Sequence, residues 1–399
     1  MKAKVSKLSV ALFLIYLLWY REAKGHVSLF LYGGTVLVAI TTLIYINRKS
    51  VRVLVPPKGI LYGIGYGVYS LIVGIVVAAD RSVMMSALIT YFAFFFVCYC
   101  ITIICQGEGD IDWLLKTIVT ICVVCAVYTL FWGYSFYNGI YVITMGPENN
   151  PNALGAFMTF GIFAVLYQNE QKLGKIIVSL AVIMLFVYII ILTGSRKSLF
   201  SALALCIIWF IVFLKDTWQN CSRGAQIIRF LLAATVFGFA ISYFSKTYLQ
   251  TASFERLLKL FSNGSASGRW EMYIEAGELF KKSKLFGIGF NQFRVLSSFQ
   301  TYSHSTYAEV LACGGIFGCL IYFTPIVWTG WLVCKQLRRE KTYRAGILFA
   351  LYAVEMFLGA VNIFLYTFMH MMMWTILYIL TENKDNVFLK YRLGGKRNV

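Results

Sequence analysis

The sequence predicts an all-α integral membrane protein that crosses the bilayer many times. Of its 399 residues, 59% are apolar and only 13% are charged, and the mean hydropathy is +0.73. A soluble chain carries roughly twice that charged fraction. Long apolar runs recur along the whole chain, and the loops between them hold most of the Lys and Arg residues. The net charge of +19 is therefore explained by membrane topology, and nucleic-acid binding is not expected.

Twelve apolar runs are long enough, or nearly so, to cross a hydrocarbon core about 30 Å thick. The first run follows a charged start like that of a signal peptide, but no small-residue cleavage site follows it, so we interpret it as a retained span. Only Asn362 separates the last two runs, which could form one long helix. The predicted spans are residues 8–20, 27–46, 59–79, 83–105, 114–137, 152–168, 174–193, 197–214, 227–244, 305–333, 345–361 and 364–380.

The distribution of Lys and Arg predicts the orientation of these spans. Loops on one side carry 22 Lys and Arg residues, whereas the loops opposite carry five: Arg21, Lys24, Arg81, Arg196 and Lys197. Because positively charged loops stay in the cytoplasm, we expect both termini there. Residues 1–399 then form a single transmembrane domain, in which residues 245–304 are one large extracytoplasmic loop.

This loop belongs to the longest polar interval of the chain, from Ser262 to Gly318. Two apolar stripes with helical spacing lie in it, and each alternates with charged residues. Such short stripes predict helices that lie at the membrane interface or cover the bundle. The stripes run from Phe254 to Phe261 and from Trp270 to Gly277.

Two arginines are candidates for binding an anion. Arg196 follows Thr193-Gly194-Ser195 at the outer end of a span, and Arg269 occupies the first turn of the predicted 270–280 helix. A cation at a helix N-terminus opposes the helix dipole, and an anion bound between it and the backbone N–H groups would stabilise it. Arg also suits bidentate contact with phosphate. The alternatives are that Arg196 snorkels to lipid headgroups and that Arg269 is an ordinary surface residue.

His304, at the start of a span, is the candidate general base. A helix N-terminus lowers the pKa of a histidine and leaves a neutral imidazole that can accept a proton. The alternative is a surface or packing histidine. Glu309 lies five residues further along the helix, about 140° around it, so we do not expect it to orient His304 directly. As an acid within a span, like Glu355, it is still a candidate functional residue.

Several classes of site have no support in the sequence. It contains no Walker motif, no D-x-D, no H-E-x-x-H and no carboxylate cluster with metal-ligand spacing. We therefore expect no metal or cofactor, and a metal-dependent glycosyltransferase that uses a soluble nucleotide sugar is disfavoured. Cys122 and Cys125 form a C-x-x-C pair inside a span, far from any histidine, which favours apolar packing over redox or metal chemistry.

Four motifs, in this order, resemble the O-antigen ligase and polysaccharide polymerase family of bacterial membrane proteins. A fifth stretch, from Asn150 to Gly155, also looks like the family's, so the resemblance covers about residues 150–320. One departure is Ser305, where the family often has Asn. The four motifs are Thr193-Gly194-Ser195-Arg196, Ser267-Gly268-Arg269-Trp270, Leu285 to Phe290, and His304 to Gly318.

The resemblance implies a fold like that of membrane glycosyltransferases of the C type. It implies metal-independent transfer of a glycan from an undecaprenyl-diphosphate carrier to an acceptor glycan, at the outer face of the bacterial cytoplasmic membrane. Such reactions build capsule, exopolysaccharide or O-antigen. By motif, Arg196 and Arg269 would hold the diphosphate and His304 would act on the acceptor hydroxyl. The secondary candidates are Glu309, Arg256 and Asn152.

Three functions stay open, and we prefer the first. A polymerase adds a growing lipid-linked chain to a new repeat unit, whereas a ligase adds the finished chain to lipid A core. Nothing in the sequence implies an outer membrane, so a polymerase is favoured. A polysaccharide or lipid transporter (a flippase) would favour charged or broken helices near the bilayer midplane and internal repeats. Here the candidate charges cluster at the outer face, and no repeat is visible.

The predicted topology is tested with accessible tags. The asymmetry in Lys and Arg places Gly264 outside and the C-terminus inside. An epitope inserted at Gly264 should therefore bind antibody on intact spheroplasts, whereas one at the C-terminus should bind only after permeabilisation. Antibody binding at Gly264 that required permeabilisation would remove the basis for an external site.

Overall fold

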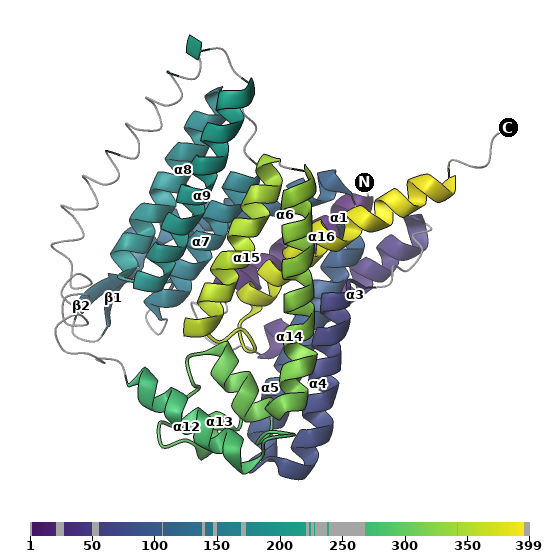
Figure 1. Ribbon diagram of the computed structural model, residues 1–399, viewed down its shortest axis with the longest axis vertical. Helices are drawn as coiled ribbons and strands as arrows, with labels where there is room; N and C mark the ends of the chain where they lie inside the picture. The colour runs from purple at the N-terminus through teal and green to yellow at the C-terminus, as the bar shows by residue number, and fades with distance from the viewer. Residues whose placement is uncertain are drawn as a thin grey trace.

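The computed structural model shows a helix bundle with one small hairpin (Figure 1). It describes residues 2–20, 28–49, 56–105, 107–137, 140–146, 150–168, 173–220, 223, 224, 227, 238, 268–340 and 342–394. The helices are α1 (Lys2–Ile15), its π-helical continuation η1 (Tyr16–Tyr20), α3 (Ser28–Lys49), α4 (Lys58–Val77), α5 (Arg81–Ile104), α6 (Glu108–Trp132), α7 (Pro151–Gln168), α8 (Leu173–Thr193), α9 (Arg196–Asn220), α12 (Arg269–Lys282), α13 (Phe293–Leu296), α14 (Thr306–Glu340), α15 (Tyr343–Val361) and α16 (Phe368–Gly394). The strands are β1 (Tyr134–Tyr137) and β2 (Ile140–Ile143).

The composition of the helices fits a membrane environment. Seven helices in the described part of the chain are long and apolar enough to cross a bilayer. Several of them leave large apolar side chains on the outer surface, among them Ile72 and Val76 of α4, which are 62% and 78% exposed. Such side chains can contact lipid tails, and a helix pairs its backbone N–H and C=O groups within itself. The chain is thus an all-α, multi-pass membrane protein.

Eleven of the twelve predicted spans coincide with a described helix. The span predicted at residues 227–244 falls almost entirely outside the described residues, so the count of twelve stays a prediction. The last two predicted spans are separate helices, since α15 ends at Val361 and α16 begins at Phe368. The connection between them, which contains Asn362, contributes to the site described below.

The span predicted at residues 114–137 is wrong at its C-terminal end. Helix α6 stops at Trp132, where the Gly133 N–H donates to the Thr129 carbonyl. Residues 134–137 instead form β1, which pairs antiparallel with β2. Both strands are rich in aromatic and β-branched residues, which favour a pleated strand, but which also extend an apolar run in the sequence.

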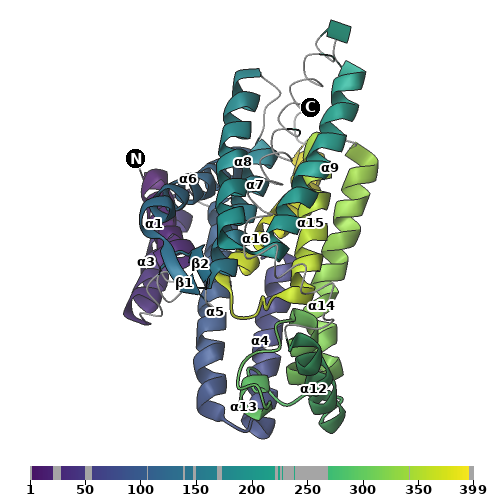
Figure 2. The same cartoon turned by 90° about the vertical axis from the view of Figure 1, so that its left-hand side faces the viewer.

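Helix α7 lies at the centre of one half of the bundle and packs against α6, α8, α9 and α15 (Figure 2). Its side chains from Leu154 to Tyr167 are buried all round, as expected for a helix that is apolar on every face. Near its N-terminus, Gly155 allows close contact with the start of α9, because a Cβ there would lie 2.7 Å from Ser198 Oγ. The start of α9 is thereby fixed against the core.

Helix α14 is broken at Gly315, whose φ of 62° and ψ of −164° are not helical. The break leaves two carbonyls and two N–H groups without partners inside the helix. Residues 284–289, which include most of the Leu285–Phe290 motif, supply those partners and so brace the broken helix. The four hydrogen bonds are Ile288 N–H to Ala312 O (3.0 Å), Gly289 N–H to Cys313 O (3.0 Å), Ile316 N–H to Lys284 O (2.9 Å) and Phe317 N–H to Leu285 O (3.2 Å).

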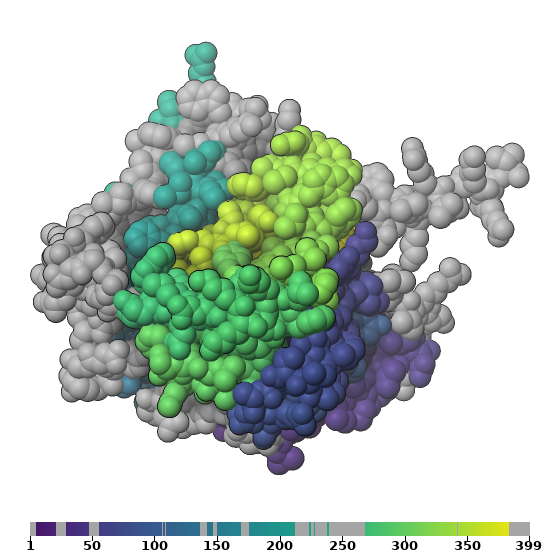
Figure 3. All heavy atoms as spheres, turned by 60° about the horizontal axis from the view of Figure 1, so that its bottom comes forward, coloured from purple at the N-terminus to yellow at the C-terminus, as the bar shows by residue number. Residues whose placement is uncertain are grey.

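Helices α12 and α13 cover one end of the bundle, and the α14–α15 turn lies at the other end (Figures 1 and 2). Seen from the end that α12 and α13 cover, the segment from α12 to α14 lies beside the α4–α5 hairpin (Figure 3). The Gln292 amide fastens the two together: its Oε1 accepts from Asp80 N–H at 2.7 Å, and its Nε2 donates to Asp80 O at 2.9 Å. The segment from α12 to α14 is therefore hydrogen-bonded to the α4–α5 hairpin.

The amphipathic helix predicted at residues 270–280 is confirmed as α12, which runs from Arg269 to Lys282 and so has Arg269 in its first turn, as predicted. The helix predicted at residues 254–261 lies outside the described residues. Nothing in the structure tests the division into one transmembrane domain with a loop at residues 245–304, which stays a prediction.

Replacement of Gly315 by Ala should destabilise the fold. A Cβ there would lie 2.5 Å from both Gly287 N and Leu285 O, and the positive φ adds a cost of about 1–2 kcal/mol for any L side chain. We expect a clearly lower unfolding temperature in detergent. Gly65→Ala in α4 is the matched control, because nothing lies within 4 Å of its Cβ position. Equal unfolding temperatures for the two variants would contradict the bracing role of the 284–289 segment.

Candidate functional site

Four segments that are far apart in the sequence meet where α12 approaches the bundle. Tyr273 of α12 donates its hydroxyl to Ala360 O at 3.2 Å, which joins α12 to the end of α15. Lys197, at the start of α9, donates to Val361 O at 3.4 Å and to Asn362 Oδ1. Thr306, at the start of α14, donates its N–H to Asn362 O at 2.8 Å. The α15–α16 connection is thus the common contact.

His304 precedes α14 by two residues and has a left-handed backbone, with a φ of 59°. Its half-buried ring packs edge-on against Tyr302, with 4.6 Å between the ring centroids. Burial, followed by the positive charges of Arg269 and Lys197, lowers the pKa of His304 to about 4. The imidazole is therefore neutral at any pH above about 5. The direction is the one predicted, but burial and two cations cause it instead of a helix N-terminus.

Glu309 holds the loop that carries His304. Its carboxylate is fully buried and accepts the Ser303 N–H at 2.9 Å and the Tyr366 hydroxyl at 3.2 Å. Glu309 was predicted not to orient the imidazole directly. The hydrogen bond from Ser303 N–H to its carboxylate is a different contact, which sequence spacing does not reveal. By binding the peptide just before His304, Glu309 positions that residue through the backbone. Ser305 supports the same loop, since its Oγ accepts the Ala308 N–H at 3.4 Å.

Arg269 is the first residue of α12 and is half-buried. Gly268 before it has a φ of 59°, a left-handed turn that aims the chain into the helix. Tyr273 lies one turn further along and anchors α12 to Ala360, as described above. Arg269 is near enough to His304 and Lys197 for its charge to act on both. A predicted phosphate ligand and the predicted base therefore share one site.

Arg196 and Lys197 are the first two residues of α9, and both are half-buried. The turn before them depends on Gly194, which has a φ of 68°. Asn152 in the first turn of α7 supports this turn, because its Oδ1 accepts the Ser195 hydroxyl at 2.8 Å. Asn152 thus orders the segment that carries Arg196 and Lys197.

Lys197 was not predicted as a site residue and was counted only as a loop charge. The contacts of Asn362 were not predicted either. The signals were present: Lys197 directly follows a motif arginine, and Asn362 is the one polar interruption between two apolar runs. Arg256 lies outside the described residues. Within the described part of the chain, no three His, Cys, Asp or Glu side chains lie close enough together to hold a metal ion.

Replacement of Glu309 by Gln should loosen the His304 loop. A glutamine has one acceptor oxygen where the carboxylate has two, so one of the two donors loses its partner at a cost of about 1–3 kcal/mol. We expect faster amide hydrogen exchange at residues 303–305. Glu275→Gln is a matched control, because Glu275 also accepts an N–H and a hydroxyl, both from Ser298, but these two hydrogen bonds are exposed to solvent. Unchanged exchange in Glu309→Gln would contradict the positioning role.

Comparison with known proteins agrees with the motifs. Residues 179–323 match the family model described as O-Antigen ligase. This segment includes Arg196, Arg269, His304 and Glu309, and also the break in α14. No curated protein sequence matches the chain. Over residues 179–323 the chain is therefore similar to O-antigen ligase, and this segment contains most of the candidate site.

Proposed function

We propose that this protein polymerises glycan repeat units, using an undecaprenyl-diphosphate-linked oligosaccharide as the donor and a second lipid-linked glycan as the acceptor. One observation carries the proposal: a neutral imidazole, His304, lies within electrostatic reach of two cations, Arg269 and Lys197. A base beside a cluster of positive charge suits a reaction in which a hydroxyl loses a proton while a diphosphate departs. The similarity to O-antigen ligase supports the same chemistry.

The proposed step is a direct displacement at the anomeric carbon of the donor. The acceptor hydroxyl oxygen forms the new C–O bond, and the bond between the anomeric carbon and the phosphate oxygen breaks. The hydroxyl proton passes to the neutral imidazole of His304. The electron pair of the broken bond stays on the leaving undecaprenyl diphosphate, which needs no acid because cationic side chains hold its charge.

The diphosphate would lie between the N-termini of α9 and α12. Arg269 is the first residue of α12, and Arg196 is the first residue of α9. Helix N-termini attract anions through their unpaired N–H groups and their dipoles. Each arginine adds a planar pair of donors that matches two phosphate oxygens. This arrangement accounts for cations at positions where a helix alone disfavours them.

A ligase is the nearest alternative, since the same site would serve if the acceptor were a lipid A core. A transporter has one observation in its favour: Glu355 and His370 are ionisable groups buried inside the bundle. We prefer an enzyme because these two groups are hydrogen-bonded into the wall of the site, as described below. We place the reaction at the outer face of the bacterial cytoplasmic membrane, with membrane lipids as neighbours, no nucleic acid as partner and both termini in the cytoplasm.

The proposal is tested by reconstituting the full chain in liposomes with a lipid-diphosphate oligosaccharide. Growth of the glycan, seen as a ladder on a gel, should occur both with and without EDTA. Arg269→Lys keeps the charge but loses the planar pair of donors, and transfer should fall about tenfold or more. Absence of any transfer to lipid-linked or lipid A acceptors, together with movement of the lipid across the bilayer, would support a transporter and overturn the proposal.

The role of His304 predicts both a rate and a pH profile. His304→Ala should lower turnover by about 10²–10⁴-fold while leaving donor binding largely intact. Because the pKa of His304 is lowered to about 4, the base is unprotonated at higher pH. The rate should therefore be level from about pH 5 upward and should fall as the pH drops through about 4.

Gln300→Ala is the control for His304→Ala, because Gln300 lies in the same loop and also has a left-handed backbone, with a φ of 51°. It should leave turnover nearly unchanged. Two outcomes contradict the assignment of the base. One is an acid limb near pH 6.5, and the other is loss of donor binding in His304→Ala.

A further inference from the structure

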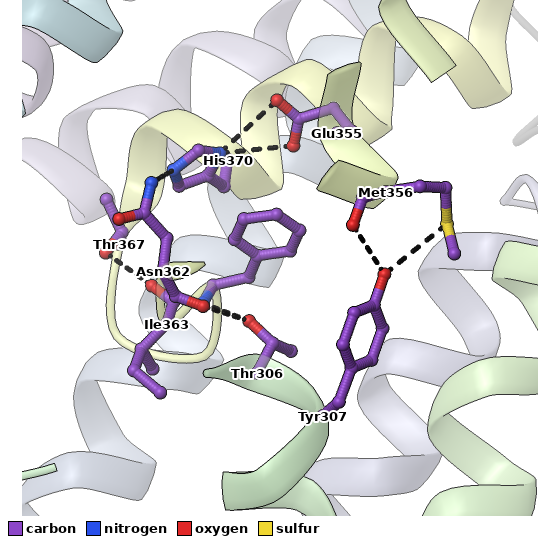
Figure 4. Close-up of polar contacts among 9 residues, drawn as sticks. Thr306, Tyr307, Glu355, Met356, Asn362, Ile363, Thr367 and His370 are labelled. Carbon is purple, nitrogen blue, oxygen red and sulfur yellow. Dashed lines mark hydrogen bonds and ion pairs between the residues drawn. The ribbon is translucent and has the colours of Figure 1, made fainter. Parts of the chain in front are cut away.

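A row of polar side chains extends from the interior of the bundle to the candidate site (Figure 4). Glu355 of α15 and His370 of α16 are 0% and 2% exposed, and His370 Nδ1 lies 3.1 Å from Glu355 Oε2. On the other side of the imidazole, Nε2 lies 3.5 Å from Asn362 Nδ2. Asn362 Oδ1 in turn accepts a hydrogen bond from Lys197. None of these contacts is part of the transfer step described above.

The donor and acceptor roles in this row follow from Lys197. An ammonium group has three N–H donors and no acceptor, so Asn362 must present its oxygen to it. The Asn362 amide nitrogen then faces His370, and as a donor it requires that Nε2 accept. A neutral His370 therefore carries its proton on Nδ1 and donates it to the Glu355 carboxylate. One orientation of each side chain satisfies all three contacts.

Asn362 also connects this row to the base. Its backbone carbonyl accepts the Thr306 N–H at 2.8 Å and the Thr306 hydroxyl at 2.7 Å. Thr306 lies two residues after His304, so one residue holds Lys197 with its side chain and the His304 loop with its backbone. The relative placement of Lys197 and His304 therefore depends on Asn362.

The described contacts leave Lys197 with a further donor. Val361 O and Asn362 Oδ1 accept two of its three N–H groups. Burial of Lys197 and, after it, repulsion by the positive charge of Arg269 both disfavour the charged form of the lysine. An anion bound beside both groups would turn that repulsion into attraction. The alternative is that Lys197 only caps the last carbonyls of α15, which is a common role for a lysine near a helix C-terminus.

We propose that Lys197 binds the diphosphate of the lipid-linked donor, and that Asn362, His370 and Glu355 are positioning residues that hold its ammonium group in place. This rests on the proposed function, because it assigns a further ligand to the same donor. Glu355 fixes the tautomer of His370, His370 fixes the amide of Asn362, and that amide fixes Lys197. A buried carboxylate would thus influence a phosphate that it does not touch.

The first test measures binding of undecaprenyl diphosphate to the purified full-length protein in nanodiscs. Lys197→Met should weaken this binding about tenfold or more, since a hydrogen bond to a charged group is lost. Lys197→Arg keeps a charged donor and should retain most of the affinity. Undecaprenol, which has no phosphate, should bind equally to all three proteins. Equal affinity for the diphosphate in Lys197→Met and the unchanged protein would mean that Lys197 only caps α15.

The second test is a double-mutant cycle. Glu355→Gln and His370→Gln should each weaken diphosphate binding about three- to tenfold in the unchanged protein, and should have no further effect in the Lys197→Met background. If Glu355→Gln and His370→Gln weaken binding as much in the Lys197→Met background as in the unchanged protein, the buried pair does not act through Lys197. Thr375→Val is the control on α16. Its buried hydroxyl contacts the Met371 carbonyl of its own helix and the Cys98 side chain of α5, neither of which belongs to the row, so binding should not change.

Asn362→Asp keeps the test valid if the buried variants do not fold. The aspartate still accepts from Lys197, but its negative charge neutralises the ammonium and it cannot donate to His370 Nε2. Asn362 is only half-buried, so this variant should fold. Its affinity for undecaprenyl diphosphate should fall, and an unchanged affinity would overturn the proposal. If the unchanged protein itself binds no diphosphate lipid, the proposed function fails. If it binds and the variants match it, only the role of Lys197 fails.

Discussion

The break in α14 is a constraint on which much of the structure depends. In lipid, every backbone donor and acceptor of a spanning helix must have a hydrogen-bond partner. At Gly315, helix α14 is broken and cannot supply all of these partners itself. The 284–289 segment supplies the missing partners, and these hydrogen bonds fix the segment between α12 and α14 against the bundle at one place. From that point the chain continues through Gln292, bound to the α4–α5 turn, to the loop that carries His304. The hydrogen bonds that the broken helix α14 needs thus order the segment between α12 and α14.

A second meeting point lies where α15 gives way to α16. The carbonyl of Asn362 holds the start of α14, and its side chain accepts from the start of α9. Tyr273 brings α12 to the same place through Ala360. Residues of the candidate site lie at or next to these helix ends: Arg196 and Lys197 begin α9, Arg269 begins α12, and His304 precedes α14. The geometry of the site is therefore set by hydrogen bonds between helix termini, which are directional and which tolerate little displacement.

Some features could be predicted from sequence and others could not, for physical reasons. Hydropathy located the helices because each must bury about 20 apolar residues in lipid. Short motifs pointed to Arg269 and His304, and the structure brings these two residues together. The β1–β2 hairpin was missed because its aromatic and β-branched residues continue an apolar run. The contact between Lys197 and Asn362 spans 165 residues, and no local pattern encodes a contact between such distant positions.

That separation also bears on how the protein is made. The ribosome delivers Lys197 to the membrane well before Val361 and Asn362 emerge, so during insertion the lysine lacks both of its acceptors. The start of α14 likewise waits for the α15–α16 connection before Thr306 finds its carbonyl. The site therefore cannot be complete before α15 and the α15–α16 connection have been made. A nascent chain that stalls before this point would hold all its motifs and no working geometry.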